Sequence, residues 1–168
     1  MDGPLYHFFT TDHRRLDGLL DAATADPAHI RTDLYQAFRV GLLTHIKMEE
    51  KILFPAAQEA NGGVPLPVQS RLRLDHGALT ALMVLPPAPA MLEVLRRLLE
   101  DHDHLEERPD GMYAACAALT ADRTEELLAQ LRATTPVPVH PPNPAPKAVD
   151  AARRALERAG RAELAAML

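Results

Sequence analysis

The chain has 168 residues, of which 47% are hydrophobic and 4% are aromatic, and it carries a formal net charge of −5. This composition favours helices over a β-sandwich or barrel, and the acidic balance argues against binding to nucleic acid. The single cysteine, Cys116, excludes an intrachain disulfide framework and any multi-cysteine zinc or iron–sulfur site. No apolar run approaches about 18 residues and the N-terminus is charged early, so we expect a cytoplasmic protein without a signal peptide or membrane span.

Four helices with apolar stripes are predicted in the first 108 residues, over about 4–24, 26–59, 68–85 and 89–107. Asp26 and Pro27 are predicted to cap the start of the second helix, and Pro55 is predicted to kink it. The separating segments are NGGVPLP at 61–67 and LPPAPA at 85–90, both rich in helix-breaking residues.

Shorter helices are expected beyond the stop signal RPDG at 108–111. Asp122 and Glu125 resemble a capping box ahead of one of them. Residues 136–146 contain six prolines and predict an extended arm, and 148–168 predict a single C-terminal helix. We therefore expect a metal-binding bundle at 1–135, a linker at 136–147 and a helix at 148–168. The arm and last helix either fold back on the bundle or bind a partner, including a second copy in a homodimer.

A pattern of histidines and carboxylates occurs twice in the chain. The sequence D-H-x-x-L-x-x-L stands at 12–19 and again at 75–82, and H-x-x-x-E-E stands at 45–50 and again at 102–107. Such a repeat predicts two helix pairs related by a pseudo-two-fold axis. This axis would bring corresponding side chains to one shared centre.

Candidate metal ligands lie on the apolar stripes of all four long helices. They are His13, His45, Glu49, His76, His102 and Glu106. A lone histidine on an apolar face is usually a hydrogen-bonded core residue, but inward-facing carboxylates among neutral imidazoles need a cation. These donors suit iron, manganese, zinc or cobalt, and six of them are too many for one tetrahedral zinc. Divided between two ions, they give two histidines to each, with both carboxylates able to bridge and positions left open for small molecules.

Polar residues near the candidate ligands are expected to have structural roles. Asp12 and Asp75 each precede a stripe histidine and could hydrogen-bond to an imidazole. We expect surface or interhelical roles instead, since the preceding position points about 100° away around the helix. Glu107 is expected to be solvated, although it could add a ligand. Tyr6 is expected to pack in the core, and Cys116 to be a small buried residue.

The order H, H-x-x-x-E, H, H-x-x-x-E on four successive helices resembles that of the hemerythrin-like (HHE cation-binding) domains, over about residues 5–133. The resemblance implies an all-α, up-down-up-down four-helix bundle with a non-haem, oxo-bridged di-iron centre held by the six ligand candidates. The chain departs from the oxygen-carrying members at two positions: Thr80 replaces a histidine, and Glu106 follows His102 at i+4 where they have aspartate at i+5. The missing histidine weakens the case for a dedicated oxygen carrier.

The leading hypothesis is a cytoplasmic di-iron protein that binds O2, NO, another small oxidant or iron itself, in sensing, storage or stress response. One alternative is a di-iron redox enzyme for peroxide or NO turnover or for the repair of iron centres. The other is a structural or interaction module in which the metal only stabilises the bundle. Zinc and manganese stay open as alternative metals, and the expected partners are metal ions with a diatomic ligand or peroxide, without nucleic acid or membrane.

Overall fold

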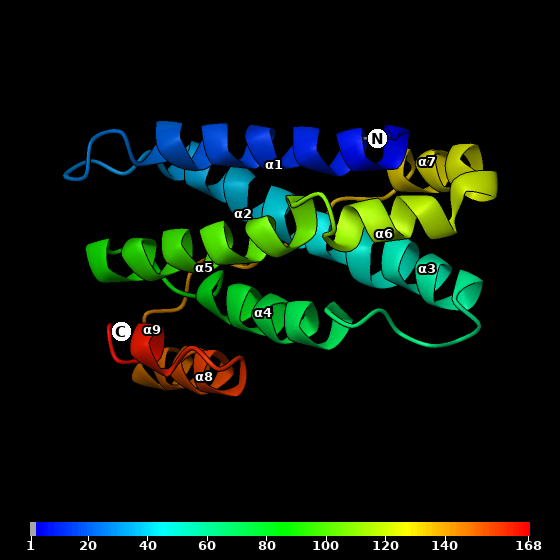
Figure 1. Cartoon of the computed structure of the whole chain (residues 1–168). Coiled ribbons are helices and arrows are strands. Elements are labelled where there is room, and N and C mark those ends of the chain that lie inside the picture. Colours follow the sequence, from blue (N-terminus) through cyan, green and yellow to red (C-terminus); the bar gives the residue numbers. More distant parts are fainter. Residues whose placement is uncertain (1–2) are drawn as a thin grey trace. The chain divides into compact units, whose positions relative to one another are not determined.

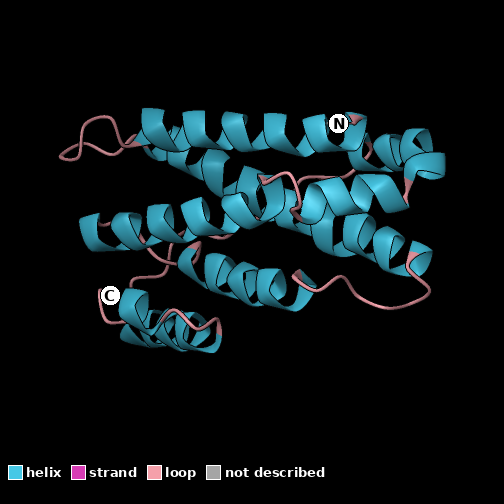
Figure 2. Ribbon diagram, viewed as in Figure 1, coloured by secondary structure: helices cyan, strands magenta, loops and turns pink. Residues whose placement is uncertain are grey.

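The computed structural model describes residues 3–168, and every regular element in that range is helical (Figures 1 and 2). The elements are α1 (Pro4–Ala23), α2 (Thr32–Met48), a π-helical turn (Glu49–Leu53), α3 (Phe54–Ala60), α4 (Gln69–Leu82), α5 (Pro89–Glu107), α6 (Met112–Leu119), a 3-10 turn (Ala121–Arg123), α7 (Thr124–Arg132), α8 (Pro146–Arg158) and α9 (Ala162–Ala165). This confirms the predicted all-α fold class. Within 3–168, no helix combines the length and apolar character that a membrane crossing requires. Met1 and Asp2, which open the predicted domain 1–135, lie outside the described residues.

The predicted start of the second helix is wrong. Residues 24–31 form turns, and α2 begins at Thr32 rather than beside Pro27. Asp26 accepts a hydrogen bond from the backbone N–H of Ala28 at 3.0 Å, and its second carboxylate oxygen lies 3.0 Å from Nδ1 of His29. An aspartate that bonds the backbone two residues on stabilises a turn, and this local bond competes with helix capping.

The region around Pro55 forms a π-helical turn followed at once by α3. The N–H of Phe54 bonds to the carbonyl of Glu49, five residues back. Proline has no N–H for the normal bond and its ring crowds the carbonyl four residues earlier, so a wider turn ahead of Pro55 relieves both problems. Such turns often occur at functional sites, and this one begins at the ligand candidate Glu49.

Two further local predictions are corrected near the C-terminus. Asp122 lies in a 3-10 turn, and α7 starts after Arg123 without a side-chain cap, so the predicted capping box does not form. The single helix predicted for 148–168 is divided into α8 and α9. Gly160 between them has a φ of +75°, a conformation that glycine adopts readily. Of the arm predicted at 136–146, residues 136–145 contain no helix, as expected, and Pro146 begins α8.

The chain divides into two compact units. Unit 1 comprises the residues up to Gln69 together with Asp103–Pro138, and unit 2 comprises Ser70–His102 together with Val139–Leu168. In unit 1, α1 packs against α2, α6 and α7, and α6 also packs against α3. In unit 2, α8 packs against α9. Helix α5 runs through the division, so its last turn belongs to unit 1.

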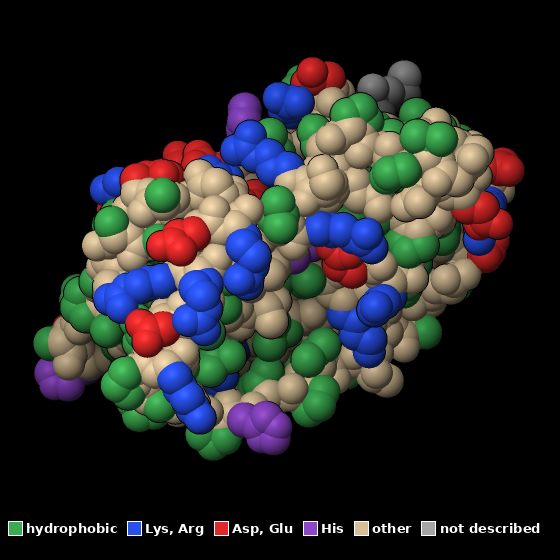
Figure 3. Space-filling view, turned by 90° about the horizontal axis from the view of Figure 1, so that it is seen from below, with side chains coloured by type: hydrophobic (Ala, Val, Ile, Leu, Met, Phe, Trp, Pro, Cys, Tyr) green, Lys and Arg blue, Asp and Glu red, His purple; other side chains and the backbone are tan. Residues whose placement is uncertain are grey.

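The apolar stripes form the cores as predicted. On α1, the stripe positions Leu5, Phe9, Leu16 and Leu20 are all buried, and His13 is buried among them. On the molecular face in Figure 3, histidine side chains appear as isolated patches among basic, acidic and hydrophobic groups. The buried histidines are therefore the ones that need explanation.

Residues 139–168 fold back on α4 and α5 within unit 2. The N–H of Asn143 donates to the carbonyl of Val84 at 2.7 Å. The buried guanidinium of Arg161, between α8 and α9, lies 3.3 Å from Asp75 on α4 and 2.7 Å from Asp101 on α5. The division into bundle, linker and C-terminal helix, and a homodimer through the arm, stay predictions.

Candidate metal centre

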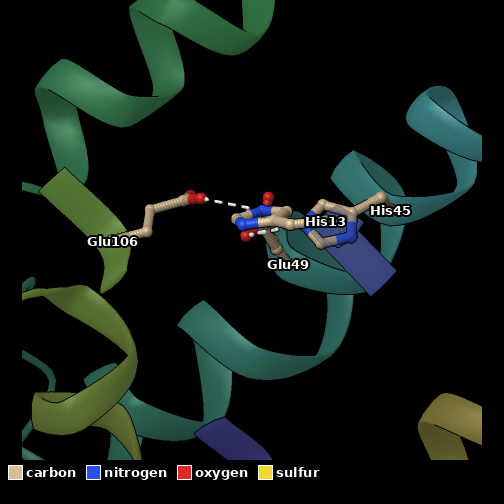
Figure 4. A group of neighbouring side chains, drawn as sticks. All are labelled: His13, His45, Glu49 and Glu106. Carbon is tan, nitrogen blue, oxygen red and sulfur yellow. Dashed lines mark hydrogen bonds and ion pairs between the residues drawn. The ribbon is translucent and has the colours of Figure 1, made fainter. Parts of the chain in front are cut away.

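Four of the six predicted ligands meet in unit 1. They are His13 from α1, His45 from α2, Glu49 from the π-helical turn and Glu106 from the last turn of α5. All four are buried, and each offers one ligand-type atom, all within 4.8 Å of one another. Figure 4 shows these side chains directed toward one another, with His45 and Glu49 on one continuous helical segment and His13 and Glu106 on two others.

His45 is oriented by an aspartate on the neighbouring helix. Its Nδ1 lies 2.8 Å from Oδ2 of Asp12, whose other oxygen accepts a hydrogen bond from Arg15 at 2.8 Å. Asp12 therefore has an interhelical role, as the hydrogen-bond partner of an imidazole on α2. The angle of about 100° that turns Asp12 away from His13 on its own helix turns it toward His45 on α2.

His13 is oriented by Glu107. Its Nδ1 lies 2.6 Å from Oε1 of Glu107, and the second oxygen of that carboxylate pairs with Arg14. The prediction that Glu107 is solvated is wrong, since its side chain is half-buried against α1. Tyr6 donates to the backbone carbonyl of Glu107 at 2.7 Å, so its hydroxyl is used beside the cluster.

These two carboxylates fix which nitrogen of each ring faces inward. With Nδ1 of both rings held from outside, the Nε2 atoms of His13 and His45 approach to 3.0 Å. Metal-ligating histidines commonly bond a carboxylate through the other ring nitrogen, which sets the tautomer and aims the ligand atom. The arrangement therefore has the form of a prepared metal site.

Tyr113, at the start of α6, is the functional residue that the sequence patterns missed. Its Oη lies 2.5 Å from Oε1 of Glu49, 2.9 Å from Oε2 of Glu106, 3.0 Å from Nε2 of His13 and 3.1 Å from Nε2 of His45. A signal exists in hindsight, because Tyr113 is a polar group in the apolar helix MYAACAAL. The position of Tyr113 could not be predicted, because the RPDG turn lies between α5 and α6 and helical spacing does not extend across a turn.

A tight turn returns α6 to the cluster. The N–H of Gly111 donates to the carbonyl of Arg108 at 2.7 Å. A Cβ at position 111 would lie 2.6 Å from the carbonyl oxygen of Glu106 and 2.8 Å from those of Leu105 and Arg108. Only glycine fits there without moving the backbone, so Gly111 permits the close return that places Tyr113 beside Glu106.

The electrostatics of the cluster are those of coupled buried groups. Burial disfavours the charged imidazolium of His45, but the charge of Glu49 and hydrogen bonds to Asp12 and Glu49 raise its pKa to about 9. Burial acts likewise on His13, and hydrogen bonds to Glu106 and Glu107 raise its pKa well above the usual value. Burial, with the charge of Glu106, raises the pKa of Tyr113 well above its usual value.

The negative charge of the site is balanced unevenly. Asp12 faces Arg15 and Glu107 faces Arg14, and these pairs reach the surface. The fully buried carboxylates lie beside imidazoles: Glu49 lies 3.3 Å from His45, and Glu106 lies 3.4 Å from His13. Buried carboxylates in such surroundings are stabilised by a cation.

The remaining two predicted ligands form a histidine pair in unit 2. His76 on α4 and His102 on α5 are buried, and their ring centroids lie 4.8 Å apart. Nδ1 of His102 lies 3.5 Å from Oδ2 of Asp75, so Asp75 has an interhelical role between α4 and α5. Burial raises the pKa of Asp75, but His102 and Arg161 outweigh it and lower the pKa below the usual value.

Cys116 is buried on α6, as predicted, and burial raises the pKa of its thiol. A neutral buried thiol is a poor nucleophile. The chemistry of the region therefore rests on imidazoles, carboxylates and one phenol.

Comparison with known proteins adds one positive finding. The family model described as the hemerythrin HHE cation binding domain matches residues 5–158. No curated protein and no solved structure shows significant similarity to the chain. The matched range contains every histidine and glutamate discussed above. It confirms the resemblance seen in the sequence, the hemerythrin-like helical bundle, and a cation-binding domain whose buried histidines and glutamates are consistent with a di-metal site.

Proposed function

The chain belongs to the hemerythrin HHE cation-binding family, and from this membership we propose that it binds two iron ions and uses them to bind a small oxidant such as O2 or NO. The observation that carries the proposal is the convergence of His13, His45, Glu49 and Glu106 within 4.8 Å in unit 1. Two imidazoles and two carboxylates form a mixed nitrogen and oxygen donor set, which suits iron better than copper(I). Four protein donors also leave positions of a six-coordinate ion open for a small ligand.

We assign the second ion to the histidine pair of unit 2. His102 precedes Glu106 by one turn on α5, as His45 precedes Glu49 by four residues at the end of α2. In both units an aspartate lies against Nδ1 of the histidine: Asp12 against His45 and Asp75 against His102. A carboxylate beside the second ring nitrogen is typical of metal-ligating histidines; Asp12 is close enough to His45 for a hydrogen bond, at 2.8 Å, and Asp75 lies 3.5 Å from His102.

When bound, iron supplies the affinity for a diatomic ligand or oxidant and the electron that reduces it. The side chains of unit 1 orient the metal ligands, balance their charge and exclude water from the site. Asp12 and Glu107 hold the imidazoles in one orientation, and Glu49 and Glu106 neutralise positive charge. Phe9 stacks on Tyr113 with ring centroids 5.0 Å apart and an interplanar angle of 24°, so the inner face is walled by aromatic rings that exclude water. Asp12 also lines a surface pocket between α1 and α7, so the outer end of this hydrogen-bond chain reaches solvent.

The test is iron uptake followed by reaction with a gas. The full chain is loaded with ferrous iron without air, desalted, assayed for iron and then exposed to O2 or NO while its visible spectrum is recorded. We expect about two irons per chain and new visible bands with either gas. The double substitution His45→Ala with His102→Ala should remove the iron and the bands.

The matched control is His104→Ala, which removes an exposed histidine two residues from His102 on the same helix. It should keep full iron content. Unchanged iron content in the variant lacking His45 and His102 would refute the ligand assignment.

A further inference from the structure

We propose that the phenol oxygen of Tyr113 is itself a metal ligand, the third oxygen donor beside Glu49 and Glu106 in unit 1. This inference rests on the proposed iron site and adds a residue from α6, outside the H-x-x-x-E pattern. It changes the donor set of that ion from two nitrogens and two oxygens to two nitrogens and three oxygens.

The contacts of Tyr113 are those of a ligand rather than of a supporting group. Its oxygen lies within 3.1 Å of all four ligand-type atoms at once. A supporting hydrogen bond normally reaches one ligand, from the side away from the metal, as Asp12 does for His45 and Glu107 does for His13. Tyr113 approaches the opposite, inward-facing nitrogens of the same two rings, so it occupies the side that an ion must share.

The ring of Tyr113 is held where a ligand would have to be. The side chain is buried, stacks on Phe9, and meets Tyr6 edge-on with ring centroids 6.4 Å apart. The backbone before it is fixed by the turn at Gly111, where three carbonyl oxygens leave no space for a Cβ. A donor fixed in advance loses little conformational entropy when the metal binds.

Coordination by Tyr113 requires the loss of one proton. The phenol O–H bond is broken, an oxygen–metal bond forms, and the proton leaves to water. Two carboxylates and one phenolate then carry three negative charges, which match ferric iron and exceed the charge of a divalent ion. The charge of this donor set therefore favours the ferric ion, because anionic oxygen donors stabilise the higher charge.

Ferric phenolate complexes absorb visible light by charge transfer, and this gives a readout independent of activity. The full chain is loaded with ferrous iron, oxidised in air and measured by visible absorption and by resonance Raman spectroscopy. The same is done for Tyr113→Phe, with iron assayed in each sample. Wild-type protein grown on ring-deuterated tyrosine identifies the ring modes without any substitution.

Tyr6→Phe is the matched control, since Tyr6 packs against Tyr113 while its hydroxyl bonds to a backbone carbonyl. We expect tyrosine ring modes in the wild type that shift on deuteration, persist in Tyr6→Phe and vanish in Tyr113→Phe. A chain that binds iron but shows no such modes overturns the assignment of Tyr113 and leaves the iron site standing. A chain that binds no iron overturns both.

Discussion

The two histidine pairs of this chain begin from the same sequence pattern and are completed differently. In unit 1, Asp12 bonds His45 at 2.8 Å and is balanced by Arg15, three residues along its own helix. In unit 2, Asp75 lies 3.5 Å from His102 and is balanced by Arg161, 86 residues away in sequence. The repeat thus conserves the imidazole and its aspartate, whereas the cation behind the aspartate comes from a different part of the chain.

The surroundings of the pairs differ further. Unit 1 adds the phenol of Tyr113 and the carboxylate of Glu107 to its histidines. Unit 2 adds the guanidinium of Arg161, which ties the C-terminal segment to α4 and α5. The first pair is thus surrounded by further ligand-type groups, whereas the second is tied to the C-terminal helices through Asp75 and Arg161.

The largest expected effect separates the pairs by metal content. His13→Ala with His45→Ala should remove the ion of unit 1 and its spectral bands, and His76→Ala with His102→Ala should remove the other ion. Each double variant should bind about one iron or fewer, since two of the protein donors of one ion are gone. Iron per chain, measured by elemental analysis on desalted protein, checks this. If both double variants still bound two irons per chain, the assignment of one ion to each histidine pair would be wrong.

The second prediction concerns the supporting aspartates. Asp12→Asn and Asp75→Asn keep the shape of the side chain but remove the charge that orients His45 and His102. Iron affinity should fall by about 10- to 100-fold in each, because such partners set the tautomer of the ligand. Competition with a coloured chelator measures the loss. Asp26→Asn, on an exposed turn, is the control and should bind as the wild type does.

Arg161 provides the third prediction, on stability. Arg161→Ala leaves the buried carboxylate of Asp75 without its guanidinium and should lower the free energy of unfolding by about 3 kcal/mol. Arg97→Ala removes an exposed pair with Glu93 and should cost less than about 0.5 kcal/mol. Urea unfolding compares the two. If both substitutions had the same small effect, Arg161 would not anchor the C-terminal segment.

The pH dependence of the metal-free chain should show effects that reach at most the size expected for Arg161→Ala. The pKa of His45 is raised to about 9, above an unfolded value of about 6.5. Its stabilisation is therefore complete below pH about 6.5 and is lost as the pH rises through about 9, by up to about 3 kcal/mol. The pKa of Asp75 is lowered, so its stabilisation is present above about pH 3.9 and is lost as the pH falls.

Urea unfolding of the metal-free protein across this range checks both directions. The alkaline loss should shrink in Asp12→Asn, which removes one cause of the raised pKa of His45. A free energy of unfolding that stays constant between pH 6.5 and 10 would contradict the assignment.

The sequence predicted those parts of the molecule that depend on regular spacing. The bounds of α5 follow from Pro89 and the RPDG turn, and the stripe of α1 places His13 among core residues. Histidines and glutamates four residues apart identify candidate ligands because they share one helix face. These features need no knowledge of how one helix lies against another.

The parts that escaped prediction depend on contacts across helices or on backbone turns. The partner of Asp12 could not be identified from the sequence, because it is His45 on the neighbouring helix. Glu107 looked solvated for the same reason. Tyr113 was hidden because the direction of α6 is set by the turn at Gly111, which spacing does not encode. The late start of α2 reflects a local aspartate turn that competes with helix capping.

The measurement that tests the central claim most directly is native mass spectrometry of the full chain titrated with ferrous iron in the absence of air. It counts the ions on each intact molecule and needs no assumption about the reaction. The account predicts that the chain takes up two irons and that the count does not rise further with excess metal. A chain that stays metal-free, or that stops at one ion, would contradict the claim that both histidine pairs are metal ligands.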